Sequence, residues 1–199
     1  AGRQASQKLV ALRKRFLSAL SDEWGAVKAY EVVFTSGGTE ADGTAVFGGC
    51  FGRRRGNVVF SAVEHSAVGA WKPLLERMGF EVRIVGVDRK GRIRVDDVIA
   101  AVDKDTVLVS LMFVNNEIGT VQPVAEACRA VKQKNARALF HTDAVQALGM
   151  LSLACLQDTV DLVSFSSHKI AGPRGCGALL VRTGLKLIPL MPGGGQQQG

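Results

Sequence analysis

Short apolar runs alternate with segments of helical spacing along almost the whole chain, and this alternation limits the fold more than any other feature. The runs that predict strands cover residues 31–34, 57–62, 82–87, 106–113, 138–142, 160–166 and 177–181. The segments that predict helices cover residues 11–20, 39–51, 66–78, 95–102 and 124–134, the third of them capped by Ser66. Near-continuous apolar strands separated by helices are typical of parallel sheets that are covered on both faces. The sequence therefore predicts an α/β fold, a mostly parallel sheet with helices on both faces.

Length, hydropathy and charge exclude several classes of protein. The chain has 199 residues, of which 47% are hydrophobic and 22% charged, values that fit one large globular domain rather than a disordered chain. No apolar run reaches the ~18 residues of a membrane span, so no membrane association is expected. The net charge of +7 raises the question of nucleic-acid binding. Because the basic residues are dispersed, with one tight cluster at 53–55, no nucleic acid is expected as a partner.

The cysteines and the chain ends set further expectations. Four cysteines lie far apart and form no CxxC pair: Cys50, Cys128, Cys155 and Cys176. This spacing disfavours a metal site or a disulfide framework, and it favours a reducing compartment, either the cytoplasm or, in a eukaryote, the mitochondrion. The chain begins within an amphipathic stretch and stops after a Gly/Gln run. We therefore expect one large domain over residues 1–199 that is truncated at both ends.

Polar residues follow five of the expected strands. In an open parallel sheet, ligands bind at the edge where the carboxyl ends of the strands meet. The polar groups that this rule places at one edge are 35–39, 64–65, 115–116, 143–146 and 166–169. Two common nucleotide motifs do not fit these groups, because the sequence has neither GxGxxG after the first strand nor GK[ST] in the glycine-bearing stretch at 37–44.

Each polar group has an ordinary structural interpretation beside a chemical one. Gly38 and Thr39 open a helix and suit a phosphate, but a tight turn with Thr39 as the N-cap explains them equally well. Asp143 could face a cationic ring nitrogen or form an ion pair. Lys169 could form a Schiff base or lie on the surface. His65 could stack on a ring, shuttle protons or simply begin a helix.

Taken together, these groups supply what pyridoxal phosphate requires. Lys169 offers the amine for an imine, and Asp143 offers a carboxylate that keeps the pyridine nitrogen protonated. The helix start and nearby hydroxyls suit the phosphate, and His65 offers a planar cover for the ring. No other common cofactor uses this set as fully, so the sequence predicts a site for pyridoxal phosphate.

Six segments resemble motifs of the cysteine desulfurases, in the same order and with matching spacing. They are FTSGGTEAD (34–42), VEHSAV (63–68), VNNEIGTVQP (114–123), FHTDAVQALG (140–149), DLVSFSSHKIAGPRGCGALLVR (161–182) and PGGGQQQG (192–199). The cysteine desulfurases belong to the class V aminotransferase group of fold-type-I pyridoxal-phosphate enzymes, with selenocysteine lyase as a close relative. The resemblance covers nearly the whole chain and implies the large, cofactor-binding domain of such a transferase.

The resemblance implies a role for each matching position. Lys169 corresponds to the lysine that forms the internal aldimine, and His65 to the imidazole that stacks on the ring and assists proton transfer. These two residues are the expected catalytic residues, and Asp143 is the expected partner of the pyridine nitrogen. The other expected cofactor contacts are Gly38, Thr39, Ser166 and His168 at the phosphate, Gln146 at the ring 3-oxygen, and Asn116 beside the substrate and the ring oxygen.

The resemblance also implies an activity and partners. A cysteine desulfurase takes sulfur from L-cysteine, leaving alanine and an enzyme persulfide, and it passes the sulfur on for purposes such as iron–sulfur cluster assembly. A homodimer, a sulfur-acceptor protein and L-cysteine or L-selenocysteine are the implied partners, and no metal is implied. The family's nucleophilic cysteine lies in a small carboxyl-terminal domain, so the isolated chain is expected to be inactive. The alternatives are a selenocysteine lyase or another class V enzyme, and an inactive fragment with a binding or scaffold role.

Overall fold

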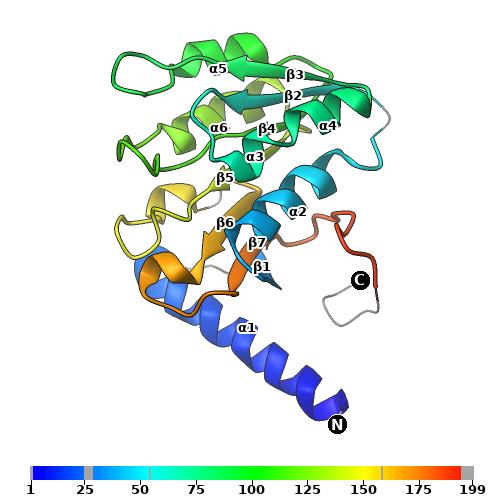
Figure 1. The fold of residues 1–199 in the computed structure, drawn as a ribbon, viewed down its shortest axis with the longest axis vertical. Helices are drawn as coiled ribbons and strands as arrows, with labels where there is room; N and C mark the ends of the chain where they lie inside the picture. The colour runs from blue at the N-terminus through cyan, green and yellow to red at the C-terminus, as the bar shows by residue number, and fades with distance from the viewer. Residues whose placement is uncertain (1, 25–28, 54, 158, 194–199) are drawn as a thin grey trace.

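The computed structural model describes residues 2–24, 29–53, 55–157 and 159–193. Within these ranges the chain forms a seven-stranded sheet in the order β1-β7-β6-β5-β4-β2-β3 (Figure 1). The strands are β1 (Tyr30–Thr35), β2 (Gly56–Ser61), β3 (Phe80–Val85), β4 (Thr106–Ser110), β5 (Leu139–Asp143), β6 (Leu162–Ser166) and β7 (Gly177–Arg182).

Strand β7 runs antiparallel to both of its neighbours, β1 and β6. The remaining pairs, from β6 through β5, β4 and β2 to β3, are all parallel. Because β7 reverses the direction twice, β1 points the same way as the other parallel strands. The prediction of a mostly parallel sheet is confirmed, and the carboxyl ends of every strand except β7 lie at one edge.

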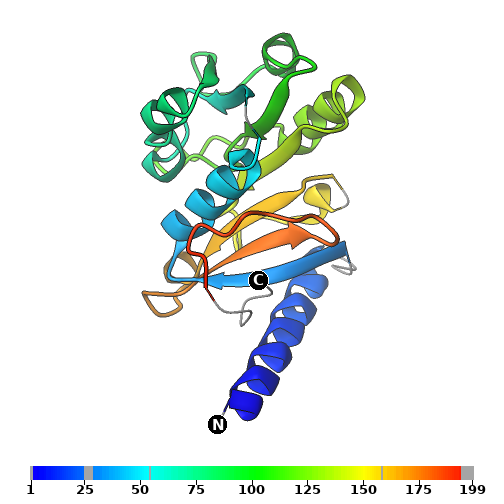
Figure 2. The same ribbon diagram turned by 90° about the vertical axis from the view of Figure 1, so that its right-hand side faces the viewer.

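Helices cover both faces of the sheet, as predicted (Figure 2). One face carries α2, α3 and α4, and the other carries α1, α5, α6 and the short 3-10 helix η2. A second 3-10 helix, η3, follows β6. Their bounds are α1 (Gly2–Trp24), α2 (Gly38–Cys50), α3 (Ser66–Gly69), α4 (Lys72–Arg77), α5 (Val95–Ala101), α6 (Val124–Lys134), η2 (Ala154–Leu156) and η3 (Ser167–Ile170). Among the described helices, none is long and apolar enough to cross a membrane.

The prediction of one helix over residues 66–78, capped by Ser66, is wrong. The segment forms two short helices, α3 and α4, and Pro73 near the start of α4 lacks the N–H that a continuous helix needs. The capping residue of α3 is His65, whose Nδ1 accepts a hydrogen bond from the backbone N–H of Ala67 at 3.1 Å. A predicted site residue is therefore fixed in place by local helix geometry.

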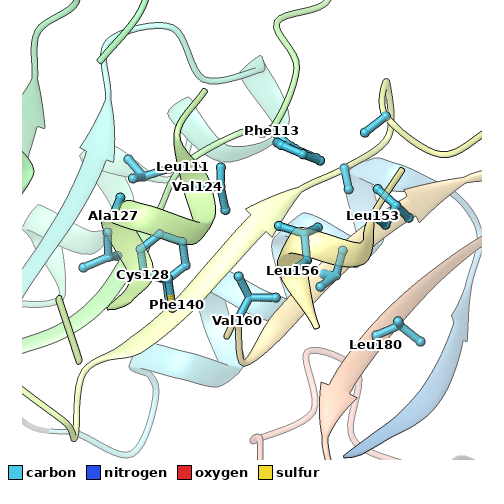
Figure 3. Packing of buried hydrophobic residues seen from close by; sticks show 14 of the residues in the cluster. Leu111, Phe113, Val124, Ala127, Cys128, Phe140, Leu153, Leu156, Val160 and Leu180 are labelled. Atoms are coloured by element: carbon cyan, nitrogen blue, oxygen red, sulfur yellow. The ribbon is translucent and has the colours of Figure 1, made fainter. Parts of the chain in front are cut away.

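The two faces of the sheet differ in how far their apolar surface extends. Toward α6, strand β5 buries Phe140 in a large cluster that fills the space under α1, α5 and α6 (Figure 3). Toward α2, the strands are apolar at their beginnings, with Leu108 and Leu139 in contact range of Gly49. The same face becomes polar toward the carboxyl ends of the strands, where His141 and Asp143 lie. The site thus lies at the polar end of an otherwise apolar interface with α2.

Phe140 is expected to be a principal source of stability, because its ring is fully buried among the side chains of the larger cluster. Phe140→Ala should lower the free energy of unfolding by about 3–5 kcal/mol, from lost apolar burial and a residual cavity. Urea denaturation followed by circular dichroism measures this loss. Ile84→Ala, which shortens a half-exposed side chain on β3, should cost less than about 1 kcal/mol. Equal losses in the two variants would contradict the assignment.

Candidate active site

Every predicted site residue lies at the carboxyl end of a strand of the common edge or in the segment that follows that end. Gly38 and Thr39 begin α2 after β1, and His65 precedes α3 after β2. Asn116 lies in the loop after β4, and Gln146 in the turn after β5. The rest lie at the ends of β5 and β6 or in η3: Asp143, Ser166, His168 and Lys169.

The beginning of α2 fits tightly between the ends of β5 and β6. A Cβ added to Gly38 would lie 3.0 Å from the Val145 side chain and 3.4 Å from Cβ of Ser166. Below it, a Cβ added to Gly177 of β7 would lie 2.6 Å from the backbone of Gly37. Glycine at these positions lets the backbone of the helix start approach the sheet edge closely.

This close approach forms an arrangement suited to an anion. The first amide groups of α2 have no intrahelical acceptor, and the helix dipole adds positive potential at this end. Beside them, the Ser166 hydroxyl and Nδ1 of His168 are 2.7 Å apart. The amides, the hydroxyl and the imidazole together are donors of the kind that bind phosphate.

The segment that carries Lys169 is held by hydrogen bonds to Ser167. Backbone N–H of Ser167 donates to Cys176 O at 3.1 Å, and its hydroxyl donates to Cys176 O at 3.0 Å and to Pro173 O. The N–H of Gly172 donates a hydrogen bond to Ser167 O at 2.9 Å. Lys169 itself is exposed, and within the described residues no hydrogen bond or ion pair joins it to the other predicted site residues.

Three buried carboxyl groups, those of Asp42, Glu64 and Asp143, influence one another at this edge. Asp143 is 6% exposed, and its Oδ1 accepts a hydrogen bond from Val145 N–H at 2.8 Å. Burial raises the pKa of Asp143, while the Val145 N–H and the nearby His65 oppose the rise. Among the described residues, no lysine or arginine forms an ion pair with any of the three.

Glu64 anchors the loop that carries His65. Its Oε1 accepts hydrogen bonds from Met112 N–H at 2.8 Å and from the Ser61 hydroxyl, whereas its buried Oε2 has no hydrogen-bond partner. Burial raises the pKa of Glu64 to about 8, against the effect of both hydrogen bonds and with a further rise from Asp143. The edge therefore combines a helix start suited to an anion with three buried carboxyl groups that form no ion pair with a lysine or arginine of the described residues.

Comparison of the chain with known protein families identifies one family. The model of the family "Aminotransferase class-V" matches residues 2–198. The chain belongs to the class V aminotransferase family. Members of this family typically depend on pyridoxal phosphate. The resemblance seen in the sequence motifs is confirmed at this level.

Individual relatives place the chain nearer to one branch of this class V family. It is 41% identical to "Cysteine desulfurase IscS" of Methanosarcina thermophila over 99% of this chain and 48% of that protein. Among solved structures, "NIFS-LIKE PROTEIN" is 37% identical with a TM-score of 0.84 and covers 94% of this chain and 52% of its own. "SspA in complex with cysteine" is 34% identical with a TM-score of 0.88 and covers 100% and 57%. The chain spans about half the length of the curated relatives it matches.

Sequence reasoning left several polar residues of the edge without a role. Glu64 stood in one of the predicted polar groups but had no function assigned, and Asp42 and His141 lay in recognised motifs without a role. Strand alternation offered a signal, because His141 precedes Asp143 by two residues and must share its face. Helix periodicity offered another, because Asp42 lies one turn after Gly38 on α2.

Glu64→Gln is expected to change the pH dependence of stability. The pKa of Glu64 is about 8 in the folded chain against an ordinary value of 4.5. The folded state holds the proton more tightly, so this stabilisation is fully present below about pH 4.5 and lost as the pH rises toward 8. Glutamine does not ionise, so the variant should gain stability relative to the wild type between pH 5 and 9, as measured by urea denaturation.

Glu117→Gln provides the matched control for this experiment, because it neutralises an exposed glutamate in the loop after β4. Its stability should follow that of the wild type at each pH. A stability difference between Glu64→Gln and the wild type that stays constant across the pH range would show that Glu64 is ionised in the folded chain throughout.

Proposed function

We propose that residues 1–199 form the large, cofactor-binding domain of a pyridoxal-phosphate-dependent cysteine desulfurase. The observation that carries this proposal is the cluster of buried carboxyl groups at the edge, in which Asp143 has no lysine or arginine partner among the residues that the structure describes. A buried carboxylate calls for a cation, and a protonated ring nitrogen is one. Class V membership and relatives named cysteine desulfurase support this reading over others.

The residues of the edge fit the cofactor at both of its ends. The tight cradle at Gly38, which a Cβ would fill, lies next to Ser166 and suits the phosphate. Oδ1 of Asp143 accepts a hydrogen bond from the Val145 N–H. We propose that Oδ2 accepts a hydrogen bond from the ring nitrogen. Bound pyridoxal phosphate supplies an electron sink for the charge that develops at the α-carbon of an amino acid.

His65 is oriented for the role proposed for it. Its Nδ1 accepts a hydrogen bond from Ala67 N–H, so the neutral imidazole carries its proton on Nε2. This bond fixes the plane of the ring at the start of α3, while the residue remains exposed at the edge. We propose that the ring covers one face of the cofactor and that Nε2 exchanges protons with the substrate.

Lys169 is proposed to bind the cofactor covalently between turnovers and to move the α-proton of the substrate. An amine in this role must lose its own proton, which a cationic neighbourhood or desolvation promotes. The hydrogen bonds of Ser167 hold η3 and the following loop together, and this keeps Lys169 at the edge. We propose that the cofactor also contacts Thr39, Asn116, Gln146 and His168, as the family motifs imply.

The remaining parts of the activity concern the whole protein. We propose L-cysteine as the substrate, alanine and a persulfide as products, a homodimer, and transfer of sulfur to an acceptor protein for uses such as iron–sulfur cluster assembly. Burial raises the pKa of Cys50 and of Cys128 to about 12, so neither thiol suits a nucleophile. Cys155 and Cys176 are exposed but, like the other two, lie outside any segment that resembles the family's catalytic-cysteine motif, so we propose that the persulfide cysteine belongs to another part of the protein and that the isolated domain is inactive. The free cysteines fit a reducing compartment such as the cytoplasm.

Selenocysteine lyase is the alternative from the same family, and an inactive scaffold is the alternative from another class. Rates with L-cysteine and L-selenocysteine on the full-length protein separate the two enzymes. The cofactor experiments below separate either enzyme from a scaffold, because a scaffold needs no covalent attachment at Lys169.

Lys169→Ala is expected to abolish covalent attachment of the cofactor. After incubation with pyridoxal phosphate and borohydride reduction, the wild-type chain should gain the mass of one pyridoxyl phosphate, and Lys169→Ala should gain none. Intact-mass spectrometry measures both. Lys104→Ala removes an exposed lysine at the opposite edge of the sheet and should behave as the wild type. Attachment that persists in Lys169→Ala, or that moves to Lys104, would remove Lys169 from its role.

Asp143→Asn is expected to weaken binding of pyridoxal phosphate by at least about tenfold, because a charge-assisted hydrogen bond to the ring nitrogen contributes roughly 1.5–3 kcal/mol. Titration of cofactor fluorescence or absorption gives the dissociation constant. Asp105→Asn, an exposed change at the far edge, should leave it unaltered. Equal affinities for Asp143→Asn and the wild type would mean that the carboxylate does not face the ring.

A further inference from the structure

A polar layer lies directly behind Asp143, and the proposed function makes no use of it. His141 shares the face of Asp143 on β5. On the adjacent strands, Ser110 of β4 is in register with His141, and Ser164 of β6 is in register with Asp143. Asp42 of α2 lies against this layer from above the sheet. All of these residues are buried, and Asp42 and His141 are at most 1% exposed.

His141 is held at both ring nitrogens. Its Nδ1 is 2.8 Å from the Ser110 hydroxyl, and its Nε2 is 2.9 Å from the Ser164 hydroxyl. Oδ1 of Asp42 lies 3.5 Å from Nε2 and has no hydrogen-bond partner. A buried carboxyl oxygen without a partner is costly, so its protonation state needs an explanation.

The groups that act on the pKa of Asp42 belong to three segments of the fold. Strand β5 contributes His141 and Asp143, the loop after β2 contributes Glu64, and β6 contributes the neutral Ser164. Burial lowers the pKa of His141 to about 3, so its imidazole is neutral. Burial, and then repulsion by Asp143 and Glu64, raise the pKa of Asp42, whereas a hydrogen bond from Ser164 opposes the rise.

An ionised Asp42 in these surroundings would be a buried charge beside a neutral ring and two other carboxyl groups. Among the described residues, the basic group that acts on this cluster is His65, and it acts on Asp143 rather than on Asp42. A proton on Asp42 removes both the desolvation cost and the repulsion, and it gives the carboxyl group a hydrogen to donate.

We propose that Asp42 holds a proton and that Asp42 and His141 together are positioning residues for Asp143. The protonated carboxyl group of Asp42 donates to the Ser164 hydroxyl oxygen, the Ser164 O–H donates to Nε2 of His141, and the Nδ1–H of His141 donates to the Ser110 hydroxyl. The layer behind Asp143 then carries no charge, which leaves Asp143 free to hold the negative charge that faces the ligand. This role for Asp143 rests on the proposed function, but the proton on Asp42 does not.

Infrared spectroscopy of the 199-residue chain tests the proton directly. Protonated carboxyl groups have a C=O stretch that is separate from the bands of carboxylates. At pH 7, Asp42→Asn should remove one component of this stretch, and Glu64→Gln should remove a different one and leave the Asp42 component in place. Identical spectra in this region for Asp42→Asn and the wild type would overturn the proposal.

Nitrogen NMR gives a second test that needs no substitution at Asp42 or His141. The chain contains three histidines, so ring ¹⁵N signals can be assigned to His65, His141 and His168 by single substitutions at the two exposed ones. His141 should remain neutral from pH 8 down to pH 5, with its proton on Nδ1. A His141 ring that titrates in this range, or that carries its proton on Nε2, would contradict the proposed hydrogen bond.

Cofactor binding tests the positioning role. Asp42→Asn keeps a neutral side chain of the same shape and should retain pyridoxal phosphate within about twofold, while Asp42→Ala leaves the hydrogen-bonded pair of Ser164 and His141 without the carboxyl group and should weaken binding about tenfold. The pH midpoint of the bound cofactor's visible absorption should be the same in Asp42→Asn and the wild type. A shifted midpoint would mean that a charge had been removed, and equal affinities in Asp42→Ala and the wild type would end the positioning role.

Different results would disprove the proposed function and the positioning role of Asp42. If the wild-type chain binds no pyridoxal phosphate, the proposed function is wrong, and the infrared and NMR results still decide whether Asp42 is protonated. If the cofactor binds and Asp42 proves ionised, the proposed function stands and the positioning role falls.

Discussion

Strand β7 runs antiparallel to both of its neighbours, so β1 and β6 point the same way although a strand separates them. This direction brings the beginning of α2 to the same edge as the ends of β5 and β6. The contact between the start of α2 and β7 is tight, because the backbone of Gly37 packs directly against Gly177. The start of α2, the acidic end of β5 and the turn that carries Lys169 therefore share one edge of the sheet because of the strand directions.

Much of this arrangement could be predicted from the sequence, because strand and helix periodicity are local properties. The alternation of apolar strands with helices predicted the parallel sheet, and the rule for strand ends predicted which polar groups share an edge. Helix α6 has the predicted bounds. The family motifs then predicted the class V family, which the comparisons confirm. The roles of Lys169, His65 and Asp143 stay predictions.

What the sequence did not predict depends on contacts between distant segments or on competing local signals. The pairing of Asp42 with His141 requires knowing how α2 lies on β5, which no local pattern contains. The break between α3 and α4 follows from Pro73 and from the capping of α3 by His65 rather than by Ser66. The raised pKa of Glu64 depends on its burial beside Met112 and Ser61, residues that belong to different strands or their ends.

The buried thiols have a consequence for how the domain responds to reagents. Cys50 and Cys128 are buried in the apolar clusters on opposite faces of the sheet, whereas Cys155 and Cys176 are exposed. Alkylation of the native chain should therefore discriminate between the two pairs without any engineering. Cys176 belongs to the loop that Ser167 fastens to the lysine-bearing turn. A fluorescent label on Cys176 would report whether the turn that carries Lys169 moves when a small molecule binds.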